Sequence, residues 1–362
     1  MPLAHYRASS KASSGSGFEV GGRITDSLDA RADLVLVVPT YTFATPVWGG
    51  HAQVAMTALA RFLGAALGMG AIVFAASSAH AQELEPRSYT NTPVGLNFLI
   101  AGYGYAEGTV AFDPSLPIAD ATFHTNTEMV AYVRSLDVWG NSTKFDVGLP
   151  YTSFAGSALL AGQPKQRDVS GLNDLRFRFS MNFYGAPALS TREFANYHQD
   201  VIIGASLQVT APTGQYDDTK LINIGNNRWS FKPQLGFSKG WGSWTVEVAP
   251  GVTFYTDNNN FNKGGTFTQD PVYSVQGHIV YGFRSGVWFA LDCTYYTGGR
   301  AIVNGVRTDT LQTNTRTGLT VAVPVNRNNS VKFNASTGTS SRTGAEFTGI
   351  GIAWQYRWGG GF

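Results

Sequence analysis

Residues 170–184 read SGLNDLRFRFSMNFY, and apolar and polar side chains alternate along this stretch one by one. Such alternation is the period of a β-strand with two different faces, because successive side chains point to opposite sides. The strand fits a soluble sandwich, with its charged face in water, or a membrane barrel, with its apolar face in lipid. The apolar face comprises Leu175, Phe177, Phe179, Met181 and Phe183, and the polar face comprises Asp174, Arg176, Arg178, Ser180 and Asn182.

The same alternation recurs along the chain after Gln82, where no stretch resembles an amphipathic helix. Each alternating stretch has roughly the ten residues that a membrane-spanning strand needs. An even number of strands returns both termini to one side, as bacterial single-chain barrels require. We predict about twelve strands, at 95–106, 123–138, 142–154, 170–184, 200–212, 228–239, 243–256, 272–284, 286–298, 312–324, 329–339 and 346–358.

Long and short connections alternate between these predicted strands. Long surface loops and short periplasmic turns are typical of outer-membrane barrels, whereas a Greek-key sandwich has no reason to alternate. The connection 185–199 should be a short turn and is long instead. Pro233 and Pro250 each remove one ladder hydrogen bond from a predicted strand and are expected at bulges. The sequence therefore predicts an all-β fold, a transmembrane antiparallel up-and-down β-barrel.

The composition agrees with a surface that does not face water. Only 14% of the 362 residues are charged, while aromatic residues make up 13% and glycines number 42. A soluble protein usually has about 25% charged residues. The net charge of +2 gives no reason to expect a nucleic-acid partner. The lone cysteine, Cys293, excludes an internal disulfide framework, and we expect it to serve in packing.

The N-terminal part of the chain predicts export. Met56 to Ala81 has the order of a secretory signal peptide, with Arg61, the uncharged run 62–76 and a small-x-small cleavage site at 79–81. We interpret residues 1–55 as a mispredicted N-terminal extension, with a disordered extension as the alternative. Residues 82–362 then form the barrel, in the outer membrane of a Gram-negative bacterium. About fourteen residues precede the first predicted strand, too few for a large plug domain, although a loop folded inward stays possible.

The end of the chain carries aromatic residues at alternate positions. Trp354, Tyr356, Trp358 and Phe362 share one predicted face. Interfacial aromatic residues would give part of this pattern. Together with the terminal phenylalanine, the pattern resembles the assembly signal of outer-membrane barrels. The expected partners are therefore outer-membrane lipid and the barrel-assembly machinery.

Several short motifs occur in order with compatible spacing: SGLNDL at 170–175, APTGQY at 211–216, NNRWSFKP at 226–233 and QDP at 269–271. They resemble the outer-membrane protein family named after the meta-pathway of phenol degradation, with Asn173 in place of the family's usual glycine. The resemblance covers most of residues 88–362. It implies an outer-membrane barrel linked to the uptake of small hydrophobic or aromatic compounds, and it assigns no catalytic residues.

Ionisable residues fall on the predicted polar face of most strands. Because an Arg or Lys facing lipid at mid-membrane would cost about 2–4 kcal/mol, these groups should line a wet lumen. Positive and negative charges are mixed among these residues, which favours a hydrated interior in which they pair. Alternatively, Arg134, Arg176 and Arg178 could form a constriction that orients aromatic carboxylates. Twelve strands predict a narrow, partly obstructed passive pore for a small-molecule solute. The predicted lining comprises Glu128, Arg134, Asp146, Asp174, Arg176, Arg178, Lys232, Glu247, Asp292 and Arg316, together with Lys144, Arg284 and Lys332.

Two other function classes stay open. A lipase-like barrel would need a serine, a histidine and an orienting acid in contact, and Ser274, His278 and Asp292 are the candidates. No GxSxG or HExxH motif supports catalysis, so no catalytic residue, cofactor or metal is expected. An adhesive barrel would act through its loops, where residues 257–260 (DNNN) could attract calcium but more often form a solvated loop tip.

Overall fold

The computed structural model describes residues 85–111 and 118–361. The predicted signal peptide, the extension 1–55 and Phe362 lie outside these residues. Among the described residues, no helix has the length and hydropathy needed to span a membrane.

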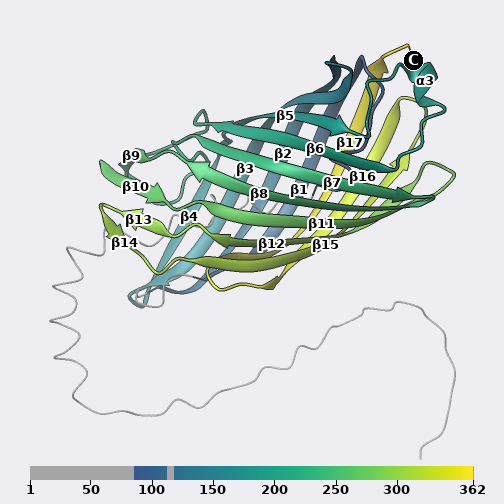
Figure 1. The fold of residues 1–362 in the computed structure, drawn as a ribbon. Coiled ribbons are helices and arrows are strands. Elements are labelled where there is room, and N and C mark those ends of the chain that lie inside the picture. The colour runs from purple at the N-terminus through teal and green to yellow at the C-terminus, as the bar shows by residue number, and fades with distance from the viewer. Residues whose placement is uncertain (1–84, 112–117, 362) are drawn as a thin grey trace, which may run out of the picture. The chain divides into compact units, whose positions relative to one another are not determined.

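The described residues form one closed antiparallel barrel of twelve strand positions (Figure 1). β1 pairs with β17 along its whole length, and the added pairing of β2 with β3 completes the ring. β4 and β5 both pair with β3 and together occupy one position. The barrel strands are β1 (Leu96–Ala111), β2 (Ile118–Val138), β3 (Asn141–Leu160), β4 (Gln163–Leu172), β5 (Leu175–Tyr184), β6 (Val201–Ala211), β7 (Ser230–Trp241), β8 (Trp244–Tyr255), β11 (Val272–Gly282), β12 (Trp288–Gly298), β15 (Gln312–Pro324), β16 (Asn329–Ser340) and β17 (Gly344–Gly359).

The strand number and the up-and-down order confirm the prediction from alternation. The difference lies at one end of the barrel, where β1 to β4 continue through residues that the sequence predicted as loops, such as 155–160 and 163–169. Threonine, serine and charged residues replace large apolar ones on the outward face there. The two faces therefore differ less, and the period of two is hard to recognise.

The end with the long connections carries a second, four-stranded sheet. It consists of β9 (Asn258–Phe261), β10 (Gly265–Gln269), β13 (Ala301–Val303) and β14 (Val306–Arg307). Phe261, Phe267, Ala301 and Val303 form its small apolar core. In outer-membrane barrels the long connections lie outside the cell, so we call this the extracellular end.

The opposite, periplasmic end has short turns and one long connection, 185–199. This connection contains α3 (Thr191–Phe194), whose N-terminus is closed by a capping box between Ser190 and Glu193. Hydrogen bonds from the Ser190 hydroxyl and amide lower the pKa of Glu193. The amides of Val94 and Ser142 donate to Leu189 and Ala186 at 2.9 and 3.0 Å. The long connection therefore lies against the periplasmic end of the barrel and binds the chain just before β1.

Pro233 and Pro250 lie in β7 and β8 without a bulge. The β7–β8 register stays constant from Ser230↔Tyr255 to Trp241↔Trp244, and pairing is interrupted only near the two prolines. The expectation of bulges was wrong, because both proline rings fit outward positions and the strands lose only local ladder bonds.

Candidate functional site

The two faces of the barrel are chemically distinct. Exposed large apolar residues share one parity on each barrel strand, apart from Tyr184 beyond the register shift at the end of β5, and in a closed barrel this face points outward. Aromatic residues lie toward both ends of the strands and aliphatic residues lie between them, which is the lipid-facing pattern of an outer-membrane barrel. The outward set includes Tyr103, Tyr151, Trp229 and Phe231 toward the extracellular end, Leu235, Ile279, Leu291 and Leu319 in the middle, and Trp241, Trp244, Trp354, Tyr356 and Trp358 toward the periplasmic end.

The inward face is largely filled by the chain that precedes β1. We call residues 85–95 the lumenal segment. The Arg87 amide donates to Glu247 at 2.6 Å, the Lys144 ammonium donates to the Ser88 carbonyl at 2.8 Å, and the Asn182 amide donates to the Tyr89 carbonyl at 3.0 Å. These partners lie on β8, β3 and β5. The segment therefore runs inside the barrel against the wall formed by these strands.

Tyr89 is the main anchor of the lumenal segment and is 2% exposed. Its hydroxyl donates to Gln234 at 3.1 Å and lies 3.2 Å from the Ser206 hydroxyl. Gly236 makes room for the ring, because a Cβ at that position would overlap it. Burial raises the pKa of Tyr89 to about 12, so the hydroxyl keeps its proton.

The lumenal segment also completes an ion-pair group. Arg178 donates to Asp146 at 3.0 Å and to Glu85 of the segment. Burial lowers the pKa of Arg87, and the nearby Glu247 carboxylate opposes this shift. Arg178 is thus held between two carboxylates, which leaves it poorly placed to attract a further anion.

The wall from β6 to β15 is packed. His278 lies 2.7 Å from Asp292, which also accepts a 2.7 Å hydrogen bond from Thr320. Glu247 accepts from the Ser238 hydroxyl at 3.2 Å. Buried polar groups of this kind need partners, and here they bind each other across neighbouring strands. The buried inward residues of this wall include Ile202, Thr210, Lys232, Ser238, Glu247, Ala249, Gln276, His278, Ala290, Asp292, Thr294, Asn314, Arg316 and Thr320.

The connection between β6 and β7 folds into the extracellular end. Asp174, which is fully buried, accepts hydrogen bonds from the Gly214 amide at 2.9 Å and the Asn226 amide at 2.8 Å. Ile224 of this connection packs with Phe123 and Phe154. The extracellular end is therefore narrowed by an apolar cluster comprising Phe123, Phe154, Ile224, Ala345, Val110, Val169, Ile222 and Phe347.

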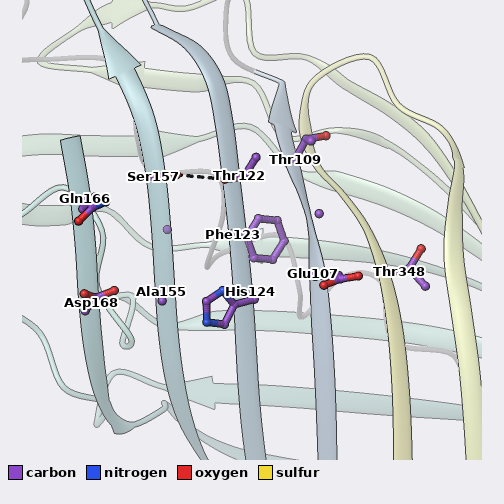
Figure 2. A pocket seen from close by; sticks show the side chains of 12 residues that line it. Glu107, Thr109, Thr122, Phe123, His124, Ala155, Ser157, Gln166, Asp168 and Thr348 are labelled. Carbon is purple, nitrogen blue, oxygen red and sulfur yellow. Dashed lines mark hydrogen bonds between the residues drawn. The ribbon is translucent and has the colours of Figure 1, made fainter. Parts of the chain in front are cut away.

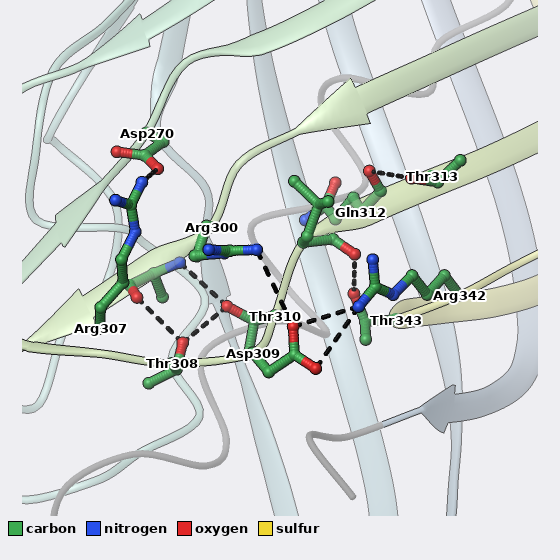
Figure 3. A network of polar contacts seen from close by, with 12 residues as sticks. Asp270, Arg300, Arg307, Thr308, Asp309, Thr310, Gln312, Thr313, Arg342 and Thr343 are labelled. Carbon is green, nitrogen blue, oxygen red and sulfur yellow. Dashed lines mark hydrogen bonds and ion pairs between the residues drawn. The ribbon is translucent and has the colours of Figure 1, made fainter.

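Charged residues join the other extracellular connections. Figure 3 shows Asp309 between Arg342 and Arg300, at 3.2 and 4.0 Å, and Arg307 paired with Asp270. Most of these side chains are partly exposed, so each pair contributes little to stability on its own. Together they tie the loop before β15 to the start of β17.

The structure places seven of the ten predicted lining residues on the inward face of strands: Asp146, Arg176, Arg178, Lys232, Glu247, Asp292 and Arg316. Asp174 is also inside, but it sits between β4 and β5 as a loop anchor. Lys144 and Lys332 have inward parity too, while Arg284 lies in the turn after β11.

Glu128 and Arg134 were wrongly predicted as lining. Glu128 pairs with the outward residues Tyr103 and Tyr151, and Arg134 pairs with outward Phe145. The constriction predicted from three arginines therefore does not form, because Arg134 faces away and Arg178 is held by two carboxylates. The sequence did not predict the lumenal segment, because an irregular segment shows no alternation of apolar and polar residues. Its only signal in the sequence was Tyr89, an aromatic residue in the polar stretch before the first strand.

A cavity of about 670 Å³ lies apart from the lumen. Figure 2 shows its lining on β1 to β4 and β17, including Glu107, His124 and Asp168. Glu107 pairs with His124 and has the parity of Tyr103, so these side chains are outward. This polar hollow lies on the outer wall at the extracellular end and is not part of a passage.

The lipase-like arrangement does not assemble. His278 and Asp292 are in contact, but the Ser274 hydroxyl bonds to the Gly251 carbonyl at 3.5 Å. Ser274 and His278 are four residues apart on one strand, too far for a hydrogen bond. Within the described part of the chain, no group of three or more His, Cys, Asp or Glu side chains could hold a metal ion.

A closed antiparallel barrel with an outward apolar belt between two aromatic belts defines an outer-membrane β-barrel protein of the Gram-negative type. Residues 102–356 match the Phenol_MetA_deg family, described as "Putative MetA-pathway of phenol degradation". The chain belongs to this family.

Among solved structures, one outer-membrane channel shows the same fold, and two other outer-membrane barrels align less well. The COG4313 outer membrane channel from Pseudomonas putida F1 aligns with a TM-score of 0.66 at 20% identity, over 76% of this chain and 100% of that one. The transport unit of the autotransporter AIDA-I from Escherichia coli aligns at 0.45 with 9% identity, over 78% and 94%. The CymD monoaromatic hydrocarbon channel aligns at 0.37 with 9% identity, over 74% and 89%. None of the curated proteins matches this chain.

Proposed function

We propose that this protein is a passive outer-membrane channel for small hydrophobic or aromatic compounds. The observation that carries the proposal is the one-sided filling of the lumen. Most inward residues from β6 to β15 are buried and a few, such as Gln208 and Gln234, are half-buried, whereas Lys332 and Asn334 on β16 have inward parity and are exposed. Inside a closed barrel, such exposure means that water reaches them.

The solute class follows from family membership and from the apolar cluster at the extracellular end. Phe123 stacks on Phe154 and meets Phe347 edge to face, each with ring centroids 6.1 Å apart. Aromatic rings recognise other aromatic rings in such arrangements. A solute that enters through this cluster would need a flat or apolar part, which favours aromatic compounds over sugars.

The arrangement favours transport over catalysis. The buried His278–Asp292 pair has no serine in reach, and the carboxylates of the interior are engaged in holding the chain together. The partners of such a channel are outer-membrane lipid and a small solute. We also propose that the barrel-assembly machinery recognises the aromatic residues at the C-terminus.

Solute flux tests the proposal directly. The folded barrel would be placed in liposomes, and influx of phenol-sized neutral aromatics would be compared with that of sugars of similar size. We expect aromatics to enter faster than sugars. Equal rates would indicate a general porin, and no flux from a barrel that shows the gel shift of a folded protein would refute a channel.

A further inference from the structure

The inward face of β1 is apolar along the whole strand. Outer-membrane barrels usually place polar residues inward, because the lumen is wet. β1 departs from this rule, so its inner face has a role other than contact with water. The inward residues of β1 are Leu96, Phe98, Ile100, Gly102, Gly104, Ala106, Gly108 and Val110, and none of them has a polar side chain.

The neighbouring strands extend this apolar face on both sides. β17, β1 and β2 lie next to one another in the barrel wall (Figure 1). Ile100 of β1 pairs with Ala131 of β2, and Gly102 pairs with Met129 of β2 and with Ala353 of β17. We call this continuous inward surface the apolar lane. It comprises Phe98, Ile100, Gly102, Gly104 and Ala106 on β1, Met129, Ala131 and Val133 on β2, and Ala353 on β17.

The apolar lane is open to the lumen. All its residues are partly exposed, and inside a closed barrel an exposed inward residue borders the lumen. The lumenal segment is anchored elsewhere, since the Tyr89 hydroxyl binds Ser206 and Gln234 on β6 and β7. Apolar inward residues of the packed wall, such as Ile202 and Ala290, are fully buried. Apolar surface that stays exposed over neighbouring elements commonly marks a binding site.

Two glycines make the middle of the apolar lane flat, and we call Gly102 and Gly104 the glycine floor. Among the described residues, only the Ile350 carbonyl oxygen of β17 would lie within 4 Å of a Cβ at Gly104. For a Cβ at Gly102, the nearest atom would be the Ile352 carbonyl oxygen at 3.5 Å, and the Met129 methyl group would lie at 3.9 Å. Glycines inside a strand often mark a place where a ligand approaches the backbone closely.

The apolar lane continues from the apolar cluster at the extracellular end. Gly108 pairs with Phe347 of β17 and Phe123 of β2, which are both cluster residues. Val110, near the end of β1, packs against the same cluster. The other end of the lane, at Phe98, lies close to the periplasmic start of β1. A solute that passes the cluster therefore stays in contact with apolar groups along the length of the lumen.

We propose that aromatic solutes cross the lumen along the apolar lane, and that the glycine floor beside Met129 binds the flat face of their ring. The inference rests on the proposed channel function and adds the path and the shape of the solute that is selected. A planar ring can lie on backbone without side chains, whereas a puckered ring touches such a surface only in part. The Met129 thioether adds a contact of the kind that sulfur makes with aromatic rings.

Block of the ion current tests the preference for flat rings. Benzyl alcohol and cyclohexylmethanol carry the same polar group, one on a planar ring and one on a puckered ring. The puckered compound is the more hydrophobic, so hydrophobicity alone predicts that it binds better. In planar bilayers, benzyl alcohol should instead halve the current of the folded protein at a concentration about two- to tenfold lower.

A valine on the glycine floor provides the matching variant. Gly104→Val should remove most of the difference between the two alcohols, because a side chain then stands where the ring lies. Gly277→Val is the matched control, since Gly277 lies on β11 between outward Val275 and Ile279 and shares their outward wall. It should keep the preference of the unchanged protein. The gel shift of a folded barrel identifies the variants that can be compared.

Protection of a thiol tests the path. In a Cys293→Ser background, Ala131→Cys places a thiol on the apolar lane, and Ser330→Cys places one at a partly exposed inward position of β16 outside the lane. Both thiols are modified with a methanethiosulfonate and followed by mass spectrometry. Benzyl alcohol should slow the modification of Ala131→Cys and leave that of Ser330→Cys unchanged.

The outcomes separate the lane from the channel function. Equal block by the two alcohols, or an unchanged preference in a folded, conducting Gly104→Val variant, would overturn the role of the glycine floor. Equal slowing at the two thiols, or none at Ala131→Cys, would overturn the path. In these cases the protein still conducts and the channel function stands. A folded barrel that passes neither ions nor solutes would instead refute the channel function, and the lane with it.

Discussion

At the scale of single residues, one glycine determines whether the lumenal segment can sit against the wall. A Cβ at Gly236 would overlap the Tyr89 ring. Gly236→Ala should therefore displace Tyr89 and raise single-channel conductance, because the segment no longer fits its place. Gly277→Ala is the control, since a Cβ there meets nothing closer than 4.0 Å. An unchanged conductance in a folded Gly236→Ala barrel would show that Tyr89 does not restrict the lumen.

Tyr89 also predicts a response to alkaline pH. Burial raises its pKa from 10.0 to about 12. The seated segment therefore holds the proton more tightly than a detached one, so its stabilisation is complete below pH 10 and is lost as pH rises toward 12. Conductance should increase over this range. Tyr89→Phe cannot ionise, and an increase that persists in this variant would assign the response to another group.

The two misplaced residues show where sequence reasoning stops at this scale. On β2 the inward positions include apolar Met129 and Val133, while Glu128 and Arg134 are outward. Both faces of this strand mix polar and apolar residues, so polarity alone does not show which face points inward. Register with β1 and β3, which depends on distant pairing, was needed to assign them. Both charges lie toward the ends of the lipid belt, where their cost falls to about 0–1 kcal/mol.

At the scale of elements, Asp174 controls the connection between β6 and β7. It binds the Gly214 amide and both the backbone and side-chain amides of Asn226, the last at 2.9 Å. Asp174→Ala leaves these buried donors unsatisfied, at about 1–3 kcal/mol each. We expect the connection to leave the lumen, with faster solute flux and new protease cleavage within residues 212–229.

Asp168→Ala is the matched control for this prediction, because it removes a carboxylate from the outward face of neighbouring β4. If Asp174→Ala folds and neither flux nor cleavage changes, the connection is held mainly by its apolar contacts with Phe123 and Phe154. The sequence placed Asp174 on the polar face of a strand, yet could not reveal this role, since its partners lie 40 and 52 residues away.

The lumenal segment and the connection 185–199 could not be predicted, because neither has a repeating pattern of apolar and polar residues. Strands are visible in sequence because lipid and lumen select different residues at alternate positions. The lumenal segment instead follows individual partners such as Gln234, Glu247 and Asn182, which lie far along the chain. The connection 185–199 likewise obtains its structure from the segment and from the capping box of α3.

At the scale of the whole molecule, strand number and order followed from sequence because closure and lipid contact constrain every strand at once. An open sheet would leave unpaired backbone groups in hydrocarbon, and the sixteen-residue β1–β17 pairing removes that edge. The open part of the lumen could not be predicted from the sequence. It is the space that remains after the lumenal segment and the β6–β7 connection have packed inside the barrel.

The outward apolar belt makes a prediction about the whole barrel. Leu235 lies midway along β7, faces outward and is 59% exposed. Leu235→Arg should lower the free energy of unfolding by about 2–4 kcal/mol in bilayers, because the charge meets the middle of the hydrocarbon. Thr348→Arg places the same charge outward on β17 beyond the belt, beside Glu107, and should cost about 0–1 kcal/mol. Reversible guanidinium unfolding in lipid vesicles measures both. Equal costs would mean that the depth assigned to the belt is wrong, whereas the expected difference would place Leu235 in the middle of the hydrocarbon and Thr348 near its edge.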